Sequence, residues 1–141
     1  MVAVHLAVGI LVLATNLAAG AWGGIAWLRR EPSVGFWYAL RVAQATVVAQ
    51  VAVGAILLIS GREGDGLHYT YGALPLLVSL LAEGARAGAA ERELTGLDFE
   101  SLPGDRQRAI ALAIVLRETG MMAVSALVIF LLALRAAFTA T

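Results

Sequence analysis

Two histidines are the side chains of this chain best suited to bind a metal or a cofactor. His5 lies near the start of the sequence and His68 near its middle, and there is no other histidine and no cysteine. Imidazole nitrogen is the commonest neutral ligand for haem iron and for transition metals. Two histidines from different helices at one level supply what haem b needs, so His5 and His68 form a candidate cofactor site. The alternative is that each is an ordinary polar residue where a helix meets the membrane surface.

Two carboxylates stand just before His68. Glu63 and Asp65 belong to a glycine-rich segment, and together with His5 they offer an alternative, outward-facing metal site. Carboxylate and imidazole ligands in combination suit a divalent ion. The segment lacks the alternating ligand spacing of a calcium-binding loop.

Four charged residues interrupt apolar stretches in the second half of the chain: Glu83, Arg86, Arg117 and Glu118. A charge at the centre of a membrane helix costs at least about 2.5 to 3.5 kcal/mol, so each needs a partner. Counting from a hairpin tip near Glu100 places Glu83 level with Arg117 on the next helix. We therefore predict a pair between Glu83 and Arg117, extended by Arg86 with Glu118, that clamps the two helices together.

A transport role is the alternative for the same carboxylates. Glu83 or Glu118 would then carry a proton or a cation across the membrane. A neighbouring arginine favours the ionised carboxylate, which argues against a proton carrier.

A second polar set falls near the middle of the first two apolar stretches: Thr15, Asn16, Gln44 and Gln50. We expect these side chains to hydrogen-bond to one another across a shared helix interface. Such bonds contribute about 0.6 kcal/mol each in membrane proteins, so their expected role is packing. The alternative is that they line a cavity for a lipid, a quinone or the edge of a cofactor.

The elements that position these side chains follow from composition. Hydrophobic residues make up 60% of the 141 positions and charged residues 14%, against about 25% charged in a soluble domain. A helix needs about 20 apolar residues to cross a hydrocarbon core about 30 Å thick. Four stretches meet this requirement, at about 2–28, 33–60, 68–94 and 105–138. We therefore predict an all-α integral membrane protein whose single domain is an up-down-up-down bundle of four transmembrane helices.

Local signals mark the ends of these helices. Ser33 and Asp105 are expected N-caps, because their short side chains can accept from first-turn amides. Pro75 leaves two alternatives for the third helix. If the helix already exists at His68, Pro75 lies inside it; if the helix begins near Leu74, His68 belongs to a loop.

Orientation follows from the arginines, which are retained on the cytoplasmic side. Eight of the ten fall near the first and third connections, whereas Arg62 and Arg135 fall on the opposite side. We therefore place both termini outside the cytoplasm, in a multi-pass protein of the cell membrane. His5 and His68 then lie at similar depth near the extracytoplasmic surface.

Small residues recur at four-residue spacing, in Gly20 with Gly24 and in Gly84 with Gly88. Both pairs permit close helix contacts, either within the bundle or between copies in a homo-oligomer.

The last two helices carry charged extensions beyond the length that a membrane requires. They predict a short hairpin that protrudes into the cytoplasm around residues 97–100. This hairpin is either a surface for another membrane subunit or a solvated turn.

Composition and absent motifs exclude several function classes. The formal net charge is zero, so no basic surface for nucleic acid is expected. There is no lysine for a phosphate-binding loop and no zinc-protease helix motif, which argues against a kinase or a conventional hydrolase. No motif identifies a family.

Three functions remain. The first is an accessory or scaffold component of a membrane complex. The second is an electron-transfer protein linked to haem b or a quinone, which is also the enzymatic role we would expect if there is one. The third is a small oligomeric proton-coupled transporter.

Overall fold

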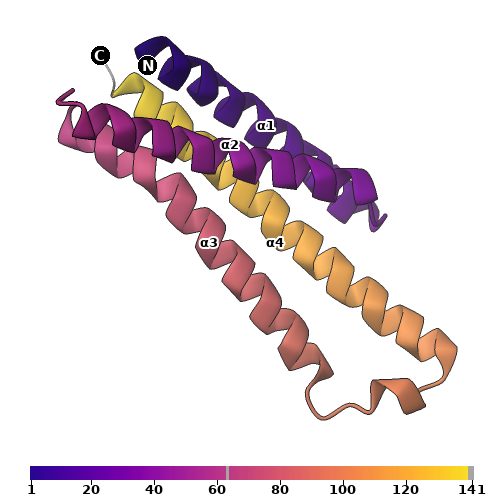
Figure 1. Cartoon of the computed structure of the whole chain (residues 1–141). Helices are drawn as coiled ribbons and strands as arrows, with labels where there is room; N and C mark the ends of the chain where they lie inside the picture. Colours follow the sequence, from indigo (N-terminus) through magenta and orange to yellow (C-terminus); the bar gives the residue numbers. More distant parts are fainter. Residues whose placement is uncertain (63, 140–141) are drawn as a thin grey trace.

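The computed structural model describes residues 1–62 and 64–139, and most of them lie in four long α-helices (Figure 1). These are α1 (Val2–Arg29), α2 (Val34–Ile59), α3 (Gly66–Leu94) and α4 (Gly104–Phe138). Each is long and apolar enough to cross a membrane. The prediction of four apolar helices is confirmed, with ends that differ from the expected ones by a few residues.

The helices do not contact their neighbours equally. α1 packs along both α2 and α4, and α4 packs along α3, whereas α2 and α3 share few close approaches. α1 and α3 are therefore diagonal to each other. The N-terminus, the end of α4 and the connection from α2 to α3 gather at one end of the bundle (Figure 1).

The core of the bundle contains two clusters of buried apolar side chains. The larger one consists of Ala19, Phe36, Leu40, Ala43, Met122 and Ala126, and the smaller one of Val12, Val47 and Ile129. The many alanines permit close contact between α1, α2 and α4.

Glycine has a packing role at only one of the four predicted positions. A Cβ at Gly20 would lie 2.6 Å from the Leu127 side chain, which only a glycine avoids, whereas Gly24 and Gly84 have no such neighbour within 4 Å. At Gly88 the nearest atom belongs to the mobile end of Arg92, a residue of the same helix. Gly84 and Gly88 therefore make no close helix contact within the bundle, and their alternative role in contact between copies stays a prediction.

The helix starts agree with the cap predictions in part. The Ser33 hydroxyl accepts a hydrogen bond from the Phe36 amide at 3.2 Å, as predicted. α4 begins at Gly104, so Asp105 lies inside its first turn and is not the N-cap. α3 begins at Gly66, which places His68 in its first turn and Pro75 inside the helix.

The hairpin of α3 and α4 extends beyond α1 and α2 (Figure 1). α4 has 35 residues, or roughly 52 Å at about 1.5 Å per residue, which exceeds the hydrocarbon thickness. A short 3-10 helix, η1 (Phe99–Ser101), lies between the two long helices. The Gln107 amide donates to the Phe99 and Leu102 carbonyls at 3.0 and 3.1 Å, and these bonds order the connection.

Candidate functional site

His5 and His68 lie in direct contact at the end of the bundle that holds both termini. Their ring centroids are 5.9 Å apart and the ring planes are inclined by 66°. His5 is in the first turn of α1 and His68 in the first turn of α3. Two diagonal helices therefore bring the only two histidines of the chain to one level.

The contacts of His68 define which of its ring nitrogens is available. His68 Nδ1 lies 3.1 Å from the Ala136 carbonyl oxygen in α4. A carbonyl can only accept, so Nδ1 carries the proton and Nε2 has a free lone pair. A backbone carbonyl on one ring nitrogen is a common support for a histidine that binds a metal through the other nitrogen.

His5 is only partly satisfied. Its Nε2 lies 3.3 Å from the side-chain nitrogen of Gln50 in α2. Two buried side-chain polar atoms within residues 1–62 and 64–139 have no hydrogen-bond partner, and both belong to this contact: His5 Nδ1 and Gln50 Oε1. A buried polar atom without a partner costs about 1 to 3 kcal/mol. The histidine cluster, defined as His5, Gln50 and His68, thus has capacity for a further ligand.

Two glycines give the histidine cluster its close fit between α1 and α2. A Cβ at Gly54 would lie 3.3 Å from His5 Cε1, and a Cβ at Gly9 would lie 3.2 Å from Gln50 Nε2. Neither glycine was predicted to have this role. The signal was the four-residue spacing of Gln50 and Gly54, which puts a polar and an open position on one face of α2.

Asp65, one of the two carboxylates of the alternative metal site, is not part of the histidine cluster. Asp65 caps α3, with its carboxylate accepting from the Leu67 amide at 3.3 Å. Glu63 lies outside the described residues. Among the residues that the structure describes, no group of three or more histidine, aspartate or glutamate side chains could hold a metal ion. The cluster therefore offers two imidazole ligands rather than a complete set.

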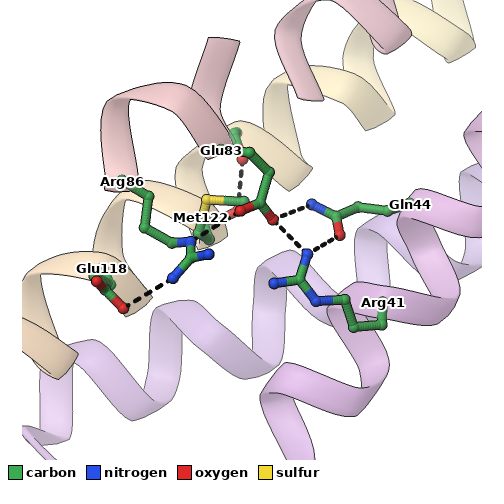
Figure 2. A network of polar contacts seen from close by, with 7 residues as sticks. Arg41, Gln44, Glu83, Arg86, Glu118 and Met122 are labelled. Carbon is green, nitrogen blue, oxygen red and sulfur yellow. Dashed lines mark hydrogen bonds and ion pairs between the residues drawn. The ribbon is translucent and has the colours of Figure 1, made fainter. Parts of the chain in front are cut away.

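Glu83 is the centre of a second polar site, which joins α2, α3 and α4 (Figure 2). One of its carboxylate oxygens accepts from Arg41 at 2.5 Å and from Gln44 at 2.8 Å, and the other accepts from Arg86 at 2.9 Å. Arg86 also pairs with Glu118 at 3.4 Å. We call Arg41, Gln44, Glu83, Arg86 and Glu118 the ionic cluster.

The ionic cluster corrects one predicted pair and confirms the other. Arg86 pairs with Glu118 as predicted, but Glu83 pairs with Arg41 and not with Arg117, which pairs instead with Glu93. Neighbouring residues on a helix point about 100° apart. The pair of Arg86 with Glu118 sets the register of the antiparallel helices, so Glu83 lies about one turn from the level of Arg117, which extends the other way to Glu93.

The expected network of Thr15, Asn16, Gln44 and Gln50 does not form. Gln44 joins the ionic cluster and Gln50 the histidine cluster, because six residues of helix separate their directions by about 240°. Asn16 is 1% exposed and bonds to a carbonyl of its own helix at 2.9 Å. Thr15 bonds across to α2 through the hydroxyl of Thr46, which lies 3.0 Å from its own hydroxyl.

The charged groups of the ionic cluster all have partners within it. Both oxygens of Glu83 accept hydrogen bonds, and the two arginines balance the two glutamates. Arg86 also lies over the Trp37 ring, 5.7 Å from its centroid. Since α2 and α3 make few other close approaches, this cluster is the main link between them.

Comparison with known protein families, with curated proteins and with solved structures gave no match. Of the two polar sites, the histidine cluster has unused ligand atoms and the ionic cluster has a full set of partners.

Proposed function

We propose that this protein binds haem b through His5 and His68 and transfers electrons in the cell membrane. One observation carries the proposal: imidazoles from two diagonal helices meet, with ring nitrogens that no protein group uses. Haem iron held by histidines is a common one-electron carrier.

The number of ligands favours haem over a bare metal ion. The described residues supply two imidazoles, and a porphyrin provides the remaining ligands of its iron. The two imidazoles already lie at one level, with ring centroids 5.9 Å apart.

Gln50 can set which ring nitrogen of His5 is free to bind the iron. A half-turn of its amide brings Oε1 to His5 Nε2, which then donates its proton to that oxygen. His5 Nδ1 is thereby left with a free lone pair for the iron. The same movement gives the buried Gln50 oxygen the partner that it lacks.

The proposed orientation places this site near the extracytoplasmic surface. Eight of ten arginines gather near the other end of the bundle, and basic residues are retained in the cytoplasm. Both termini are then extracytoplasmic. A haem at this end would exchange electrons with a quinone or with another membrane subunit.

An absorption spectrum of the detergent-purified protein from cells supplied with haem tests the proposal. We expect a Soret band, and we expect it to be lost in both His5→Ala and His68→Ala. Tyr69→Phe is the matched control, because Tyr69 lies beside His68, 6.3 Å between ring centroids, and offers no imidazole. A colourless protein, or a band unchanged in the histidine variants, would refute haem binding.

A second candidate is a scaffold role for the hairpin of α3 and α4, in a complex with other membrane subunits or further copies of the chain. It is favoured by the extension of the hairpin beyond α1 and α2 (Figure 1) and by the hydrogen bonds of Gln107. Replacing residues 96–104 with a short glycine loop should then remove co-purifying partners. Gln107→Ala removes the hydrogen bonds that order the connection but keeps the side chains of residues 96–104. It therefore shows whether partner binding depends on those side chains or on the order of the connection. An unchanged set of partners would exclude the hairpin as the interface.

The proton-coupled transporter has the least support. A proton on Glu83 would displace at least one of the three hydrogen bonds that its carboxylate accepts, and two of these come from arginines, which favour the ionised form.

A further inference from the structure

A groove of about 760 Å³ lies at the C-terminal end of α1, the opposite end of that helix from His5. Its walls are Trp27 from α1, Arg30 directly after α1, and Ala82 from α3. Its floor is a stripe of α4 that includes Leu116, Arg117, Gly120, Met121 and Val124. These residues recur every three or four positions, so they share one face of the helix. We call this site the cationic groove.

The groove combines two arginines with an apolar floor. The Arg30 guanidinium has no hydrogen bond or ion pair with any residue in the described ranges. Arg117 directs one Nη toward Glu93 and is 54% exposed, which leaves its other N–H groups available. Met121 and Val124 continue the floor for about two turns from Arg117.

Arg30 also has an unusual backbone conformation. Its φ of 56° and ψ of 34° place it in the left-handed region at the end of α1, and it is the one non-glycine residue with a positive φ among those described. Glycine is the usual residue at this position of a helix end. The sequence has an arginine where glycine would be less strained, which suggests that its charge is used.

Trp27 determines the shape of the groove. A Cβ at Gly120 would lie 2.8 Å from the Trp27 ring, so the indole rests on α4 only because residue 120 is glycine. This contact holds the end of α1, and with it Arg30, beside the floor of the groove.

We propose that the cationic groove binds one anionic phospholipid. Its phosphate would lie between Arg30 and Arg117, and one acyl chain would follow the apolar floor toward Val124. Basic pockets between membrane helices are a recurrent site for anionic head groups. The inference is independent of haem binding, since it uses other residues at the other end of α1.

Native mass spectrometry of the protein with phosphatidylglycerol or phosphatidylcholine of identical acyl chains tests the site. We expect one phosphatidylglycerol to be retained in preference to phosphatidylcholine. Arg30→Gln should weaken this binding about fivefold. Arg30→Gly should weaken it equally while keeping the helix end folded, because glycine accepts the left-handed conformation.

Two matched controls separate the groove from general surface charge and bulk. Arg29→Gln removes the neighbouring charge outside the groove, and should leave binding unchanged. Val124→Trp fills the floor and should abolish binding, whereas Leu131→Trp, two turns further along α4, should not. Equal retention of the two lipids, equal loss with Arg29→Gln and Arg30→Gln, or full binding by Val124→Trp would each overturn the proposal.

Discussion

The histidine cluster and the ionic cluster both consist of polar side chains from several helices, but they differ in how many of their polar atoms have hydrogen-bond partners. Both connect α2 to other helices through a glutamine, Gln50 in one and Gln44 in the other. In the ionic cluster Glu83 has three donors. In the histidine cluster His5 Nδ1 and Gln50 Oε1 are buried without partners.

This difference separates a structural role from a binding role. A buried network whose members are all paired rigidifies the helices that supply it. A buried network with unused atoms costs stability, so its retention points to a ligand that completes it. On this argument the ionic cluster holds α2, α3 and α4 together, and the histidine cluster binds the cofactor.

The largest expected effect on stability comes from the ionic cluster. Glu83→Gln removes the carboxylate partner of Arg41 and one of the two carboxylate partners of Arg86. We expect it to lower the free energy of unfolding in detergent by about 2 to 3 kcal/mol, below the full cost of breaking a buried pair because Arg41 is half exposed. Glu93→Gln is the control, since its partner Arg117 is also half exposed, and should cost less than about 1 kcal/mol. Equal costs for the two variants would contradict the clamp.

The glycine that admits the His5 ring should be the next most sensitive position. Gly54→Ala brings a methyl group to 3.3 Å from His5 Cε1, and we expect a loss of about 1 kcal/mol together with reduced haem binding. The Cβ added by Gly24→Ala meets nothing within 4 Å, so this control should lower neither the free energy of unfolding nor haem binding. Thermal unfolding and haem titration measure the two effects. Normal haem binding by Gly54→Ala would show that the ring position is not critical.

Gln50→Leu should have the smallest effect on folding. It removes a buried oxygen that has no partner, which offsets the loss of the hydrogen bond from Gln50 Nε2 to His5, so we expect a change in unfolding free energy within about 0.5 kcal/mol. Loss of the residue that orients His5 should nevertheless weaken haem binding about tenfold or more. A large loss of stability with unchanged haem affinity would make Gln50 a packing residue.

Sequence patterns predicted the helices because each one spans a length that the membrane dictates. Counting from the hairpin predicted the pair of Glu83 with Arg117, which is wrong, whereas the pair of Arg86 with Glu118, predicted as its extension, is confirmed because α3 and α4 are consecutive and antiparallel. The partner of Glu83 was not predictable in this way. Arg41 comes from α2, and which face α2 turns to α3 depends on how all four helices pack.

The sequence predicted that His5 and His68 lie at the same depth in the membrane, but not that their rings touch. Two histidines near the starts of parallel helices lie at one level, but contact between diagonal helices requires space in between. Here that space comes from Gly54 and Gly9, and the effect of a missing side chain depends on neighbours that no local pattern specifies. The role of Gln50 was missed for the same reason.

The haem-to-protein ratio of the purified protein tests the central difference between the two clusters most directly. We expect about one haem per chain in the unaltered protein, the same ratio in Glu83→Gln despite its lower stability, and none in His68→Ala despite a normal fold. Absence of haem from the unaltered protein, or a ratio in His68→Ala equal to that in Glu83→Gln, would contradict the account.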